Sequence, residues 1–433
     1  MAKNKHTFWN LADRLEGDKV VWVITLMLIL LSAVCLFSST SRLLESGQTR
    51  IDIVRSQLIT IAAGLAIIIV LYNIRDIKYF RFLAPLGFPL SLALLAILDL
   101  HQKVGPFEPI KINEVYRILS VGGVQVHVFE VVKVAMVMYL AWAMDALERR
   151  KIKWPHNMLL RRILFVYLPF IVTMLAVIPG SNSSALFIGG IMFIVILLGG
   201  GSRRDMLVLA AAALLVVSSC FGIYKLSDGK YMTRIGTGIS RITEKNNWAD
   251  SVMAAKPYSD DYYRYLDKIR QPYGAKIAIK EGGIVGKGPG QSTQRYMVPD
   301  MSEDYMFSFI VEEYGLLGGI LVILLYVSLL ARGSLIARNC GSDLFAKISV
   351  AGLSLLIVLQ AFLHITVNAD IGPMTGQTLP LVSHGKSAFL CFCVAFGVIL
   401  SISRMMSDRM KKEQKNAEPI VEPQIEQEDG QQG

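Results

Sequence analysis

The sequence predicts an all-α polytopic membrane protein with about ten transmembrane helices and a large extracytoplasmic loop between helices 7 and 8. Hydrophobic residues make up 53% of the 433 residues and the mean hydropathy is positive, so the chain is too apolar for an ordinary soluble protein. Apolar runs long enough to cross about 30 Å of hydrocarbon recur along it. They cover residues 20–39, 56–73, 80–99, 128–146, 163–179, 184–200, 206–224, 306–330, 347–367 and 379–402.

These runs divide the chain into three parts. Residues 1–19 form a polar N-terminal arm, residues 20–405 the ten-helix transmembrane domain, and residues 406–433 a polar tail. The tail cannot bury a hydrophobic core, so we expect it to be disordered. The sixth and tenth runs are the least regular, because the sixth contains several glycines and the tenth follows Pro380.

Basic residues gather in loops that fall on one side of the predicted helices. They lie in the connections 147–162, 201–205 and 331–347 and directly after the last apolar run. Short loops rich in Lys and Arg stay in the cytoplasm, so we expect both termini there and residues 224–305 on the opposite side. The net charge of +10 then indicates topology and attraction to anionic lipid, not nucleic-acid binding.

Residues 224–305 form a segment far longer than an ordinary connection, and such segments are usually functional. Charges of both signs and several tyrosines favour short helices in the membrane interface. The glycine-rich part, residues 281–295, fits either a backbone anion site near Lys287 or tight turns with positive φ. It is not a Walker A loop, because no Gly-Lys-Ser/Thr follows at the required spacing.

An acidic cluster lies at the start of the eighth apolar run, which itself carries two carboxylates. Charge at membrane depth is costly, so an ionisable residue there indicates a functional site. Asp304, at the expected boundary of water and membrane, is the first candidate for chemistry; alternatively it complements the helix dipole. Glu312 lies about 12 Å further along a continuous helix, and Glu313 faces nearly opposite. We therefore expect both glutamates to serve helix packing or partner contact.

Several motifs occur in a fixed order along the chain. They are Arg55-x-Gln57, Arg117 before Gly122, Glu130-x-x-Lys133, Gly282-Gly283-x-x-Gly286-Lys287-Gly288-x-Gly290-x-Ser292-x-Gln294, Asp304 before Glu312-Glu313-x-Gly315, and Gly376-x-x-Leu379-Pro380-x-x-Ser383-x-Gly385-x-Ser387. Together they closely resemble the hallmark of the SEDS family (shape, elongation, division and sporulation), which includes FtsW, RodA and SpoVE. The resemblance covers roughly residues 18–405, and residues 375–380 and 400–404 look most like the cell-division branch, FtsW.

The chain also departs from the usual family pattern. The departures lie at Ile118, His127–Phe129, Gly274, Glu303, His384 and Lys386. Because Asp304 and the Glu130/Lys133 pair are kept, we interpret the sequence as a divergent but active member.

The resemblance implies a peptidoglycan glycosyltransferase that polymerises lipid II into glycan strands during cell division or cell-wall growth. The transfer would be inverting and take place at the outer face of the bacterial inner membrane, with Asp304 as general base for the acceptor hydroxyl. Substrate-binding candidates are Arg117, Glu130, Lys133, Arg234, Arg241, Lys287, Ser292, Gln294, Arg295, Ser383 and Ser387. Alternatively, Glu130 and Lys133 form a buried structural salt bridge, and Arg234 and Arg241 are solvated loop charges.

The resemblance also implies partners. These are lipid II, glycan linked to undecaprenyl pyrophosphate, a class B penicillin-binding protein (a transpeptidase) and other divisome or elongasome membrane proteins. The scattered histidines predict no protein-built metal site, although Mg²⁺ or Mn²⁺ can accompany the substrate pyrophosphate. Two other functions stay open: a lipid II flippase with a polar path through the membrane, and a non-catalytic scaffold for a transpeptidase.

Overall fold

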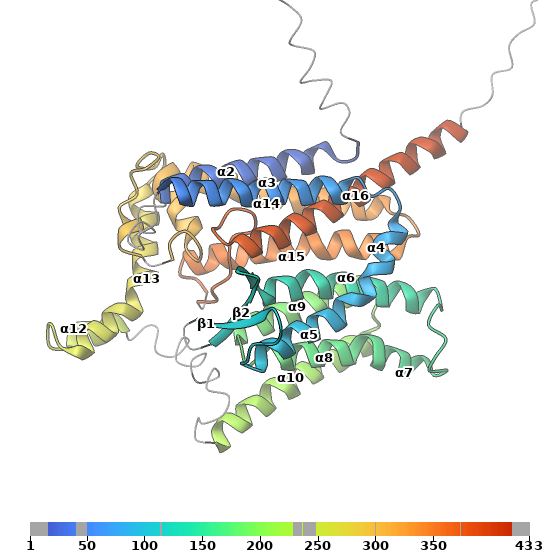
Figure 1. The fold of residues 1–433 in the computed structure, drawn as a ribbon, viewed down its shortest axis with the longest axis horizontal. Coiled ribbons are helices and arrows are strands. Elements are labelled where there is room, and N and C mark those ends of the chain that lie inside the picture. The colour runs from blue at the N-terminus through green and yellow to red at the C-terminus, as the bar shows by residue number, and fades with distance from the viewer. Residues whose placement is uncertain are drawn as a thin grey trace, which may run out of the picture.

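The computed structural model describes residues 16–39, 50–112, 115–227, 236, 248–298, 300–372 and 374–417. Long helices running side by side make up most of this part of the chain (Figure 1). Every predicted apolar run overlaps helix: α2 (Lys19–Ser39), α3 (Arg50–Tyr72), α4 to α5 (Ile77–Asp99), α6 (Val128–Glu148), α7 to α8 (Met158–Val177), α9 (Asn182–Leu198), α10 (Arg203–Leu226), α14 (Met306–Asn339), α15 (Leu344–Asn368) and α16 (Lys386–Ala417). Among the described residues, 8 helical stretches are long and apolar enough to cross a membrane, which confirms the predicted class.

The other two predicted spans, α6 and α9, are not among these 8 stretches, and the reasons are separate. α9 is apolar but only 17 residues long. α6 carries Glu130, Lys133 and Asp145, all of them buried. It packs against α5, α9, α15 and α16, so protein rather than lipid surrounds its charged groups. α6 is therefore the central helix of the bundle, which is where an intramembrane ion pair can be tolerated.

Two of the predicted spans are interrupted by irregular turns. A 3₁₀ turn, η2 (Ala84–Leu86), separates α4 (Ile77–Leu83) from α5 (Gly87–Asp99), and a π-helical turn, η3 (Ile163–Tyr167), separates α7 (Met158–Arg162) from α8 (Leu168–Val177). Pro85 and Pro169 lie at these breaks. Proline has no backbone N–H to donate, so it interrupts the helical hydrogen-bond ladder there.

A small antiparallel sheet lies between α5 and α6, where the sequence analysis predicted no strands. It consists of β1 (Phe107–Ile112), β2 (Val115–Val121) and β3 (Val124–His127), in that order. Gly122 and Gly123 join β2 to β3, both with positive φ (58° and 87°), which is the geometry of a two-residue hairpin turn. The sheet positions Arg117 on β2 and leads directly into α6.

The long segment before α14 contains one long helix rather than only short ones. α12 (Trp248–Ala254) is short, but α13 (Asp260–Gly282) has 23 residues and packs against α14. Ser259 caps its N-terminus by accepting from the Tyr262 N–H, and Gly283, with φ of 53°, ends it. The expectation of short interfacial helices is therefore wrong for α13.

The last helix differs from its predicted extent at both ends. It begins at Lys386 rather than at residue 379, because the preceding residues form a turn in which Leu381 has a φ of 62°. It continues to Ala417, beyond residue 405, where the disordered tail was expected to follow. Residues 418–433 lie outside the described part.

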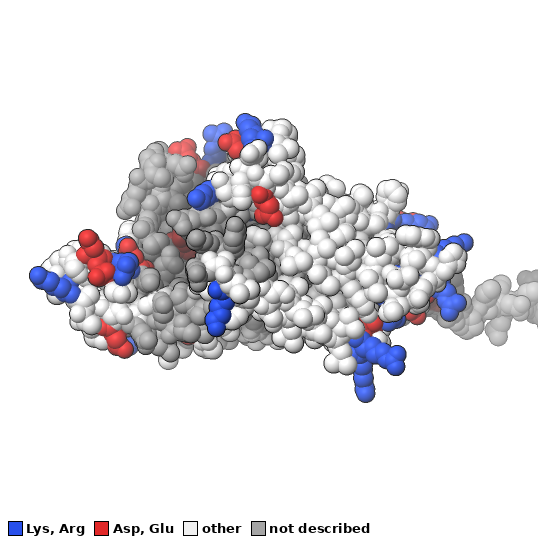
Figure 2. Space-filling model, turned by 90° about the horizontal axis from the view of Figure 1, so that it is seen from below, with Lys and Arg blue, Asp and Glu red and all other residues white. Residues whose placement is uncertain are grey.

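The two ends of the bundle carry different elements (Figure 1). The described start of α2 and the end of α16 lie at one end, and α12, α13 and the sheet lie toward the other. On the face shown in Figure 2, uncharged residues cover the middle, while Lys, Arg, Asp and Glu appear toward the ends. This distribution suits a protein whose middle faces lipid.

Candidate active site

Asp304 lies just before α14, not within it. The Asp304 N–H donates to the Asp300 carbonyl oxygen at 2.9 Å, and Asn368 Nδ2 donates to the Asp304 carbonyl oxygen at 3.1 Å. Asn368 Oδ1 in turn accepts from the Ser308 N–H at 2.9 Å, so the end of α15 fixes the backbone on both sides of the helix start. The side chain of Asp304 is partly exposed. The helical geometry assumed from Asp304 to Glu312 is therefore wrong, because α14 begins only at Met306.

The Asp304 carboxylate faces Gly376. A Cβ atom built on Gly376 would lie 3.6 Å from Asp304 Oδ2, and Gly376 has a φ of 62°. Hydrogen bonds fix the residues on either side of Gly376. Ser183 Oγ donates to the Thr375 carbonyl at 3.1 Å, and His364 Nδ1 lies 2.7 Å from the Gln377 carbonyl. A glycine therefore leaves space beside a carboxylate whose surroundings are fixed.

His364 links α14 to the same segment. Its Nε2 accepts from the Phe307 N–H at 3.2 Å, so its Nδ1 carries the proton donated to the Gln377 carbonyl. His364 is 1% exposed. Both ring nitrogens are thus engaged in fixing the backbone near Asp304, which is the role of a packed histidine rather than of a metal ligand.

Lys133 is the centre of a buried polar cluster next to this segment. Its Nζ lies 2.6 Å from Glu130 Oε1, 2.7 Å from Gln360 Oε1 and 2.9 Å from Gln377 Oε1. An ammonium group has three N–H donors, so these contacts use all of them. Gln377 continues the cluster by donating from Nε2 to Ser184 Oγ at 3.2 Å. The arrangement favours the structural alternative for Glu130 and Lys133, in which they hold α6, α15 and the Gly376 segment together.

Ser383 and Ser387 also hold backbone. Ser383 Oγ accepts from the Leu379 N–H at 2.8 Å and donates to the Glu303 carbonyl at 2.7 Å. Ser387 Oγ accepts from the His127 N–H at 3.0 Å, which joins α16 to β3. The two serines therefore connect the turn before α16 to the residue preceding Asp304 and to the sheet.

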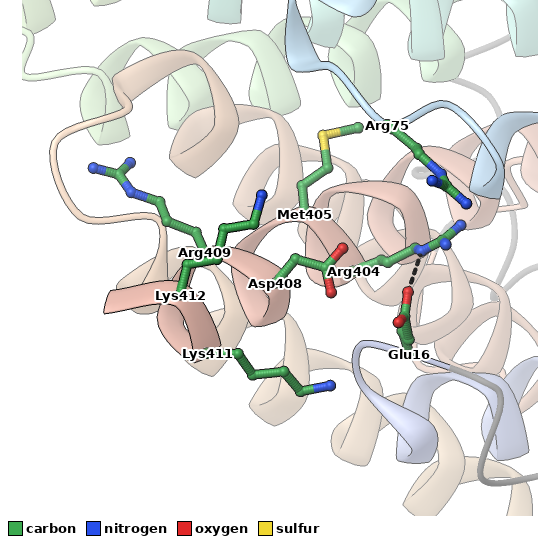
Figure 3. Close-up of a pocket in the computed structure, with 8 residues that line it drawn as sticks. All are labelled: Glu16, Arg75, Arg404, Met405, Asp408, Arg409, Lys411 and Lys412. Carbon is green, nitrogen blue, oxygen red and sulfur yellow. Dashed lines mark hydrogen bonds and ion pairs between the residues drawn. The ribbon is translucent and has the colours of Figure 1, made fainter. Parts of the chain in front are cut away.

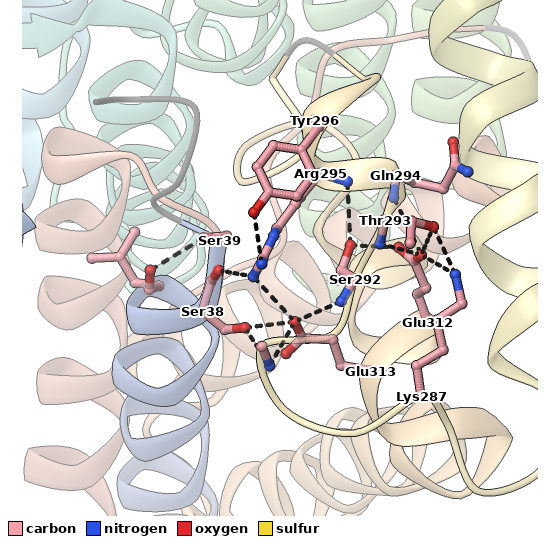
Figure 4. Close-up of polar contacts among 12 residues, drawn as sticks. Ser38, Ser39, Lys287, Ser292, Thr293, Gln294, Arg295, Tyr296, Glu312 and Glu313 are labelled. Carbon is pink, nitrogen blue, oxygen red and sulfur yellow. Dashed lines mark hydrogen bonds and ion pairs between the residues drawn. The ribbon is translucent and has the colours of Figure 1, made fainter. Parts of the chain in front are cut away.

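A second cluster forms where the glycine-rich loop meets α14 (Figure 4). Glu312 accepts from Lys287 Nζ at 2.8 Å, from Ser292 Oγ at 2.5 Å and from the Thr293 N–H at 2.8 Å. The N–H of Gln294 also donates to Glu312, at 3.2 Å. This carboxylate is 0% exposed, so the loop encloses it completely.

Glu313 serves the same loop from the other side. It accepts from Ser38 Oγ at 2.5 Å and from the N–H groups of Gly290 and Ser292 at 3.1 and 3.4 Å. Arg295 supports this contact, because its Nη1 donates to the Ser38 carbonyl at 2.7 Å. Glu313 therefore contacts a neighbouring helix, α2, as expected, but both glutamates also bind the glycine-rich loop, which the sequence did not predict.

Close backbone contact requires a glycine at Gly286 in the loop and at Gly315 in α14. A Cβ atom on Gly286 would lie 2.2 Å from the Glu313 carbonyl oxygen, and one on Gly315 would lie 2.1 Å from the Ile284 carbonyl oxygen. Gly315 also breaks α14 with a φ of 69°. The lysine ammonium and several N–H groups of this loop point at protein carboxylates, so the loop uses its anion-binding capacity on Glu312 and Glu313.

The remaining predicted residues are placed as follows. Arg117 Nε on β2 donates to the Gly180 carbonyl at 3.3 Å. Arg234 and Arg241 lie outside the described residues. The structure thus brings Glu130, Lys133 and Ser383 to the segments around Asp304, and it gathers Lys287, Ser292, Gln294 and Arg295 around the α14 glutamates.

Sequence reasoning missed three amide side chains, Gln360, Asn368 and Gln377. The first two lie on the buried face of α15, a helix with few other polar residues, and this was the available signal. Gln377 lies within the Gly376 motif. Among the described residues, no group of three or more His, Cys, Asp or Glu side chains is arranged to hold a metal ion.

Glu303 is the titratable neighbour of Asp304. Burial, together with the negative charges of Asp304 and Asp300, raises the pKa of the Glu303 carboxyl to about 8. Near neutral pH it is therefore mostly uncharged, so Asp304 does not have an ionised carboxylate as its immediate neighbour in sequence.

The fold and the site define a polytopic helical membrane protein with a partly exposed carboxylate set beside a buried polar cluster. Residues 18–408 match the model of the FtsW/RodA/SpoVE family, described as "Cell cycle protein", and the chain belongs to that family.

Known relatives agree with this assignment. Stage V sporulation protein E of Bacillus subtilis (strain 168) is 35% identical over 148 residues, which are 32% of this chain and 40% of that protein. "Peptidoglycan glycosyltransferase MrdB" of Escherichia coli (strain K12) is 36% identical over 146 residues, 32% of this chain and 39% of that one. The chain thus matches about two fifths of the length of these curated relatives.

Solved structures share the fold over more of the chain. A chain from "Structural coordination of polymerization and crosslinking by a peptidoglycan synthase complex" superposes with a TM-score of 0.62 at 21% identity, covering 90% of this chain and 98% of that chain. The crystal structure of Thermus thermophilus RodA superposes with a TM-score of 0.55 at 21% identity and the same coverage. At this identity the likeness establishes the fold.

Proposed function

We propose that the protein is a peptidoglycan glycosyltransferase that polymerises lipid II, the lipid-linked disaccharide-peptide precursor, into glycan strands. Membership of the FtsW/RodA/SpoVE family supports this, as do the relatives named peptidoglycan glycosyltransferase. The observation that carries the proposal is the partly exposed Asp304, held in place through its backbone by α15 and left open on one side by Gly376. Such a fixed carboxylate suits a catalytic base.

In the proposed reaction, Asp304 accepts the proton of the acceptor sugar hydroxyl as that oxygen attacks the anomeric carbon of the growing strand. The bond from that carbon to undecaprenyl pyrophosphate breaks, and the pyrophosphate leaves with its electron pair. A single displacement inverts the configuration and needs one base, which matches one carboxylate.

Charge on the leaving pyrophosphate requires cations. Arg117 is one candidate; it lies on β2, where its Nε donates to the Gly180 carbonyl, whereas Lys287 and Arg295 contact the loop and the α14 glutamates. Mg²⁺ or Mn²⁺ carried by the substrate would add to this neutralisation. We propose Arg234 and Arg241 as further contacts.

We also propose the topology and the partners. Lys and Arg are concentrated in the connections at the end of the bundle that holds the described chain ends, so this end would be cytoplasmic and the α12–α13 end extracytoplasmic, in a bacterial inner membrane. A class B penicillin-binding protein would be the partner that crosslinks the strands. The complex described for the superposed peptidoglycan synthase chain supports this choice.

The test is conversion of labelled lipid II to glycan by purified protein together with its transpeptidase. Asp304→Asn should lower the rate by at least about 100-fold, the typical contribution of a general base. Asp300→Asn is the matched control, since Asp300 is exposed and only four residues away. Glycan ladders of normal length and rate from Asp304→Asn would refute the role of Asp304.

A second experiment distinguishes polymerase from flippase. Lipid II is supplied only to the outer leaflet of proteoliposomes in which the α12–α13 end faces outward. Polymerisation without translocation is the expected result. Failure of that reaction, together with movement of labelled lipid II that survives Asp304→Asn, would instead identify a flippase.

A further inference from the structure

A cationic cavity, drawn in Figure 3, is lined by the C-terminal part of α16 and therefore lies at the end of the bundle opposite α12 and α13. Its volume is about 570 Å³, and it is formed by Arg75 in the α3–α4 connection, by residues 404–412 of α16 and by Glu16 before α2. The basic residues that line it are Arg75, Arg404, Arg409, Lys411 and Lys412. Two acidic residues, Glu16 and Asp408, line it as well, so positive charge is in excess.

The cavity's charges are only partly neutralised. Arg404 pairs with Glu16 at 2.8 Å, and Arg409 pairs with Glu413 at 3.0 Å. Within the described part of the chain, Arg75, Lys411 and Lys412 form no ion pair. Figure 3 shows the guanidinium groups of Arg75 and Arg404 at the same end of the cavity, with one carboxylate, Glu16, beside them. Adjacent positive groups of this kind are stabilised by a bound anion.

Arg404 is built into the wall of the cavity rather than free to move. Its guanidinium lies 4.9 Å from the centre of the Tyr72 ring, and its Nη1 donates to the Tyr72 carbonyl at 3.5 Å. Gly17 packs so closely against α16 that a Cβ atom there would lie 2.9 Å from the Arg404 N atom. The cationic groups therefore lie on a fixed backbone, which lowers the cost of ordering them around a ligand.

Exposed apolar side chains lie on α3 and α4, the helices on either side of Arg75 in the chain. On α3, Ile69 and Val70 are 51% and 65% exposed, and Tyr79 at the start of α4 is 64% exposed. Arg75 lies between Val70 and Tyr79 in the chain. Basic residues placed just past an apolar belt lie at the depth of lipid phosphates. A free phosphate ion would use the same cations but would gain nothing from the apolar surface.

We propose that this cavity binds the phosphate headgroup of an anionic phospholipid, whose acyl chains lie against α3 and α4. Guanidinium groups suit this role, because each can donate two parallel hydrogen bonds to a phosphate. Lys411 and Lys412 line the cavity from the part of α16 that continues beyond the predicted span. Lipid binding would give this helical extension a function.

Native mass spectrometry of the full chain in detergent, titrated with dioleoyl phosphatidylglycerol, tests the proposal. The Arg75→Gln/Lys411→Gln variant should bind this lipid about 25-fold more weakly, at about fivefold for each charge removed. Lys151→Gln/Lys153→Gln is the matched control: it removes the same charge from exposed positions in the α6–α7 connection and should change the affinity less than twofold. The unfolding midpoint of each variant checks that it is folded.

Four results would overturn the proposal. Equal loss in both double variants would mean general attraction to the basic end of the protein. Equal binding of dioleoyl phosphatidylcholine would mean that the anionic headgroup is not recognised. Displacement of the lipid by millimolar inorganic phosphate would identify a phosphate site. Lipid binding seen only in a chain ending at Ala417 would mean that the acidic residues 418–433 occupy the cavity instead.

Discussion

Replacing Lys133 by Met should lower the stability of the fold, and any loss of activity should follow from that loss of stability. The substitution keeps the length of the side chain but removes the cation that lies 2.6 Å from Glu130. Lys133 is 2% exposed and Glu130 9%, so Glu130 would become an uncompensated buried charge, at a cost of about 3–5 kcal/mol. Gln360 and Gln377 would each lose a donor, adding about 1 kcal/mol apiece.

The free energy of unfolding should therefore fall by about 5–7 kcal/mol, summed from those costs. Thermal unfolding in detergent, followed by tryptophan fluorescence, should show a midpoint lowered by roughly 5–10 °C. The double variant Glu130→Leu/Lys133→Met should recover most of this loss, because removing both partners leaves no unpaired charge. Lys111→Met, at an exposed position on β1, is the control and should unfold like the wild type.

Glycan synthesis measured on the same samples separates the two roles of the pair. A Lys133→Met protein with the wild-type midpoint and no glycan synthesis would refute the structural reasoning, since it would mean that the ammonium acts on substrate. Recovery of activity as well as stability in the double variant would confirm that the pair only positions the Gly376 segment.

Three further outcomes are expected. Glu312→Gln loses the ion pair with Lys287, so amide hydrogen exchange in the glycine-rich loop should become faster by about tenfold, equivalent to about 1.4 kcal/mol. Gly376→Ala puts a methyl group 3.6 Å from Asp304 Oδ2 at a φ of 62°, so activity should fall by at least about tenfold while the fold survives. The pKa of Glu303 is raised from 4.5 to about 8, so the folded state holds this proton more tightly than the unfolded state. The stability that the protonated carboxyl contributes is complete below pH 4.5 and is lost as pH rises through 8. Glu303→Gln should therefore stabilise the protein more at pH 9 than at pH 6.

The first two outcomes have matched control variants. Glu281→Gln removes the exposed partner of the same lysine and should leave loop exchange nearly unchanged. Gly341→Ala has a similar φ of 57° but no atom within 4 Å, so it reports the backbone cost alone. Equal loss of activity in both glycine variants would contradict the argument for Gly376. Unchanged amide hydrogen exchange of the loop in Glu312→Gln would contradict the argument for the ion pair. A gain in stability that is the same at pH 6 and pH 9 in Glu303→Gln would contradict the argument for Glu303.

The helices could be predicted from the sequence because their signal is local. A run of apolar residues fixes where a span lies without knowledge of its neighbours, and every predicted run overlaps a helix. The small sheet was missed because its strands are short and lie between two long apolar runs. Its local signal was Gly122-Gly123, a two-residue turn flanked by residues of strand character.

The site was less accessible because its contacts are long-range. Lys133 meets Gln360 and Gln377, which are 227 and 244 residues away in the chain. No periodicity within α6 indicates those partners. The contacts of Glu312 and Glu313 are also long-range, since Ser292 lies 20 residues from Glu312 and Ser38 lies 275 residues from Glu313.

Three acidic residues, Glu312, Glu130 and Asp304, differ in how accessible their carboxylates are to a substrate. The Glu312 carboxylate is enclosed and accepts hydrogen bonds from the loop on both oxygens, so it cannot take a substrate proton without releasing those donors. Glu130 is held by Lys133 behind the Gly376 segment. Asp304 differs in its exposure, because its side chain is partly exposed beside Gly376 while Asn368 holds its backbone. A base must be fixed in position and still reachable by substrate, and of these three carboxylates Asp304 meets both conditions.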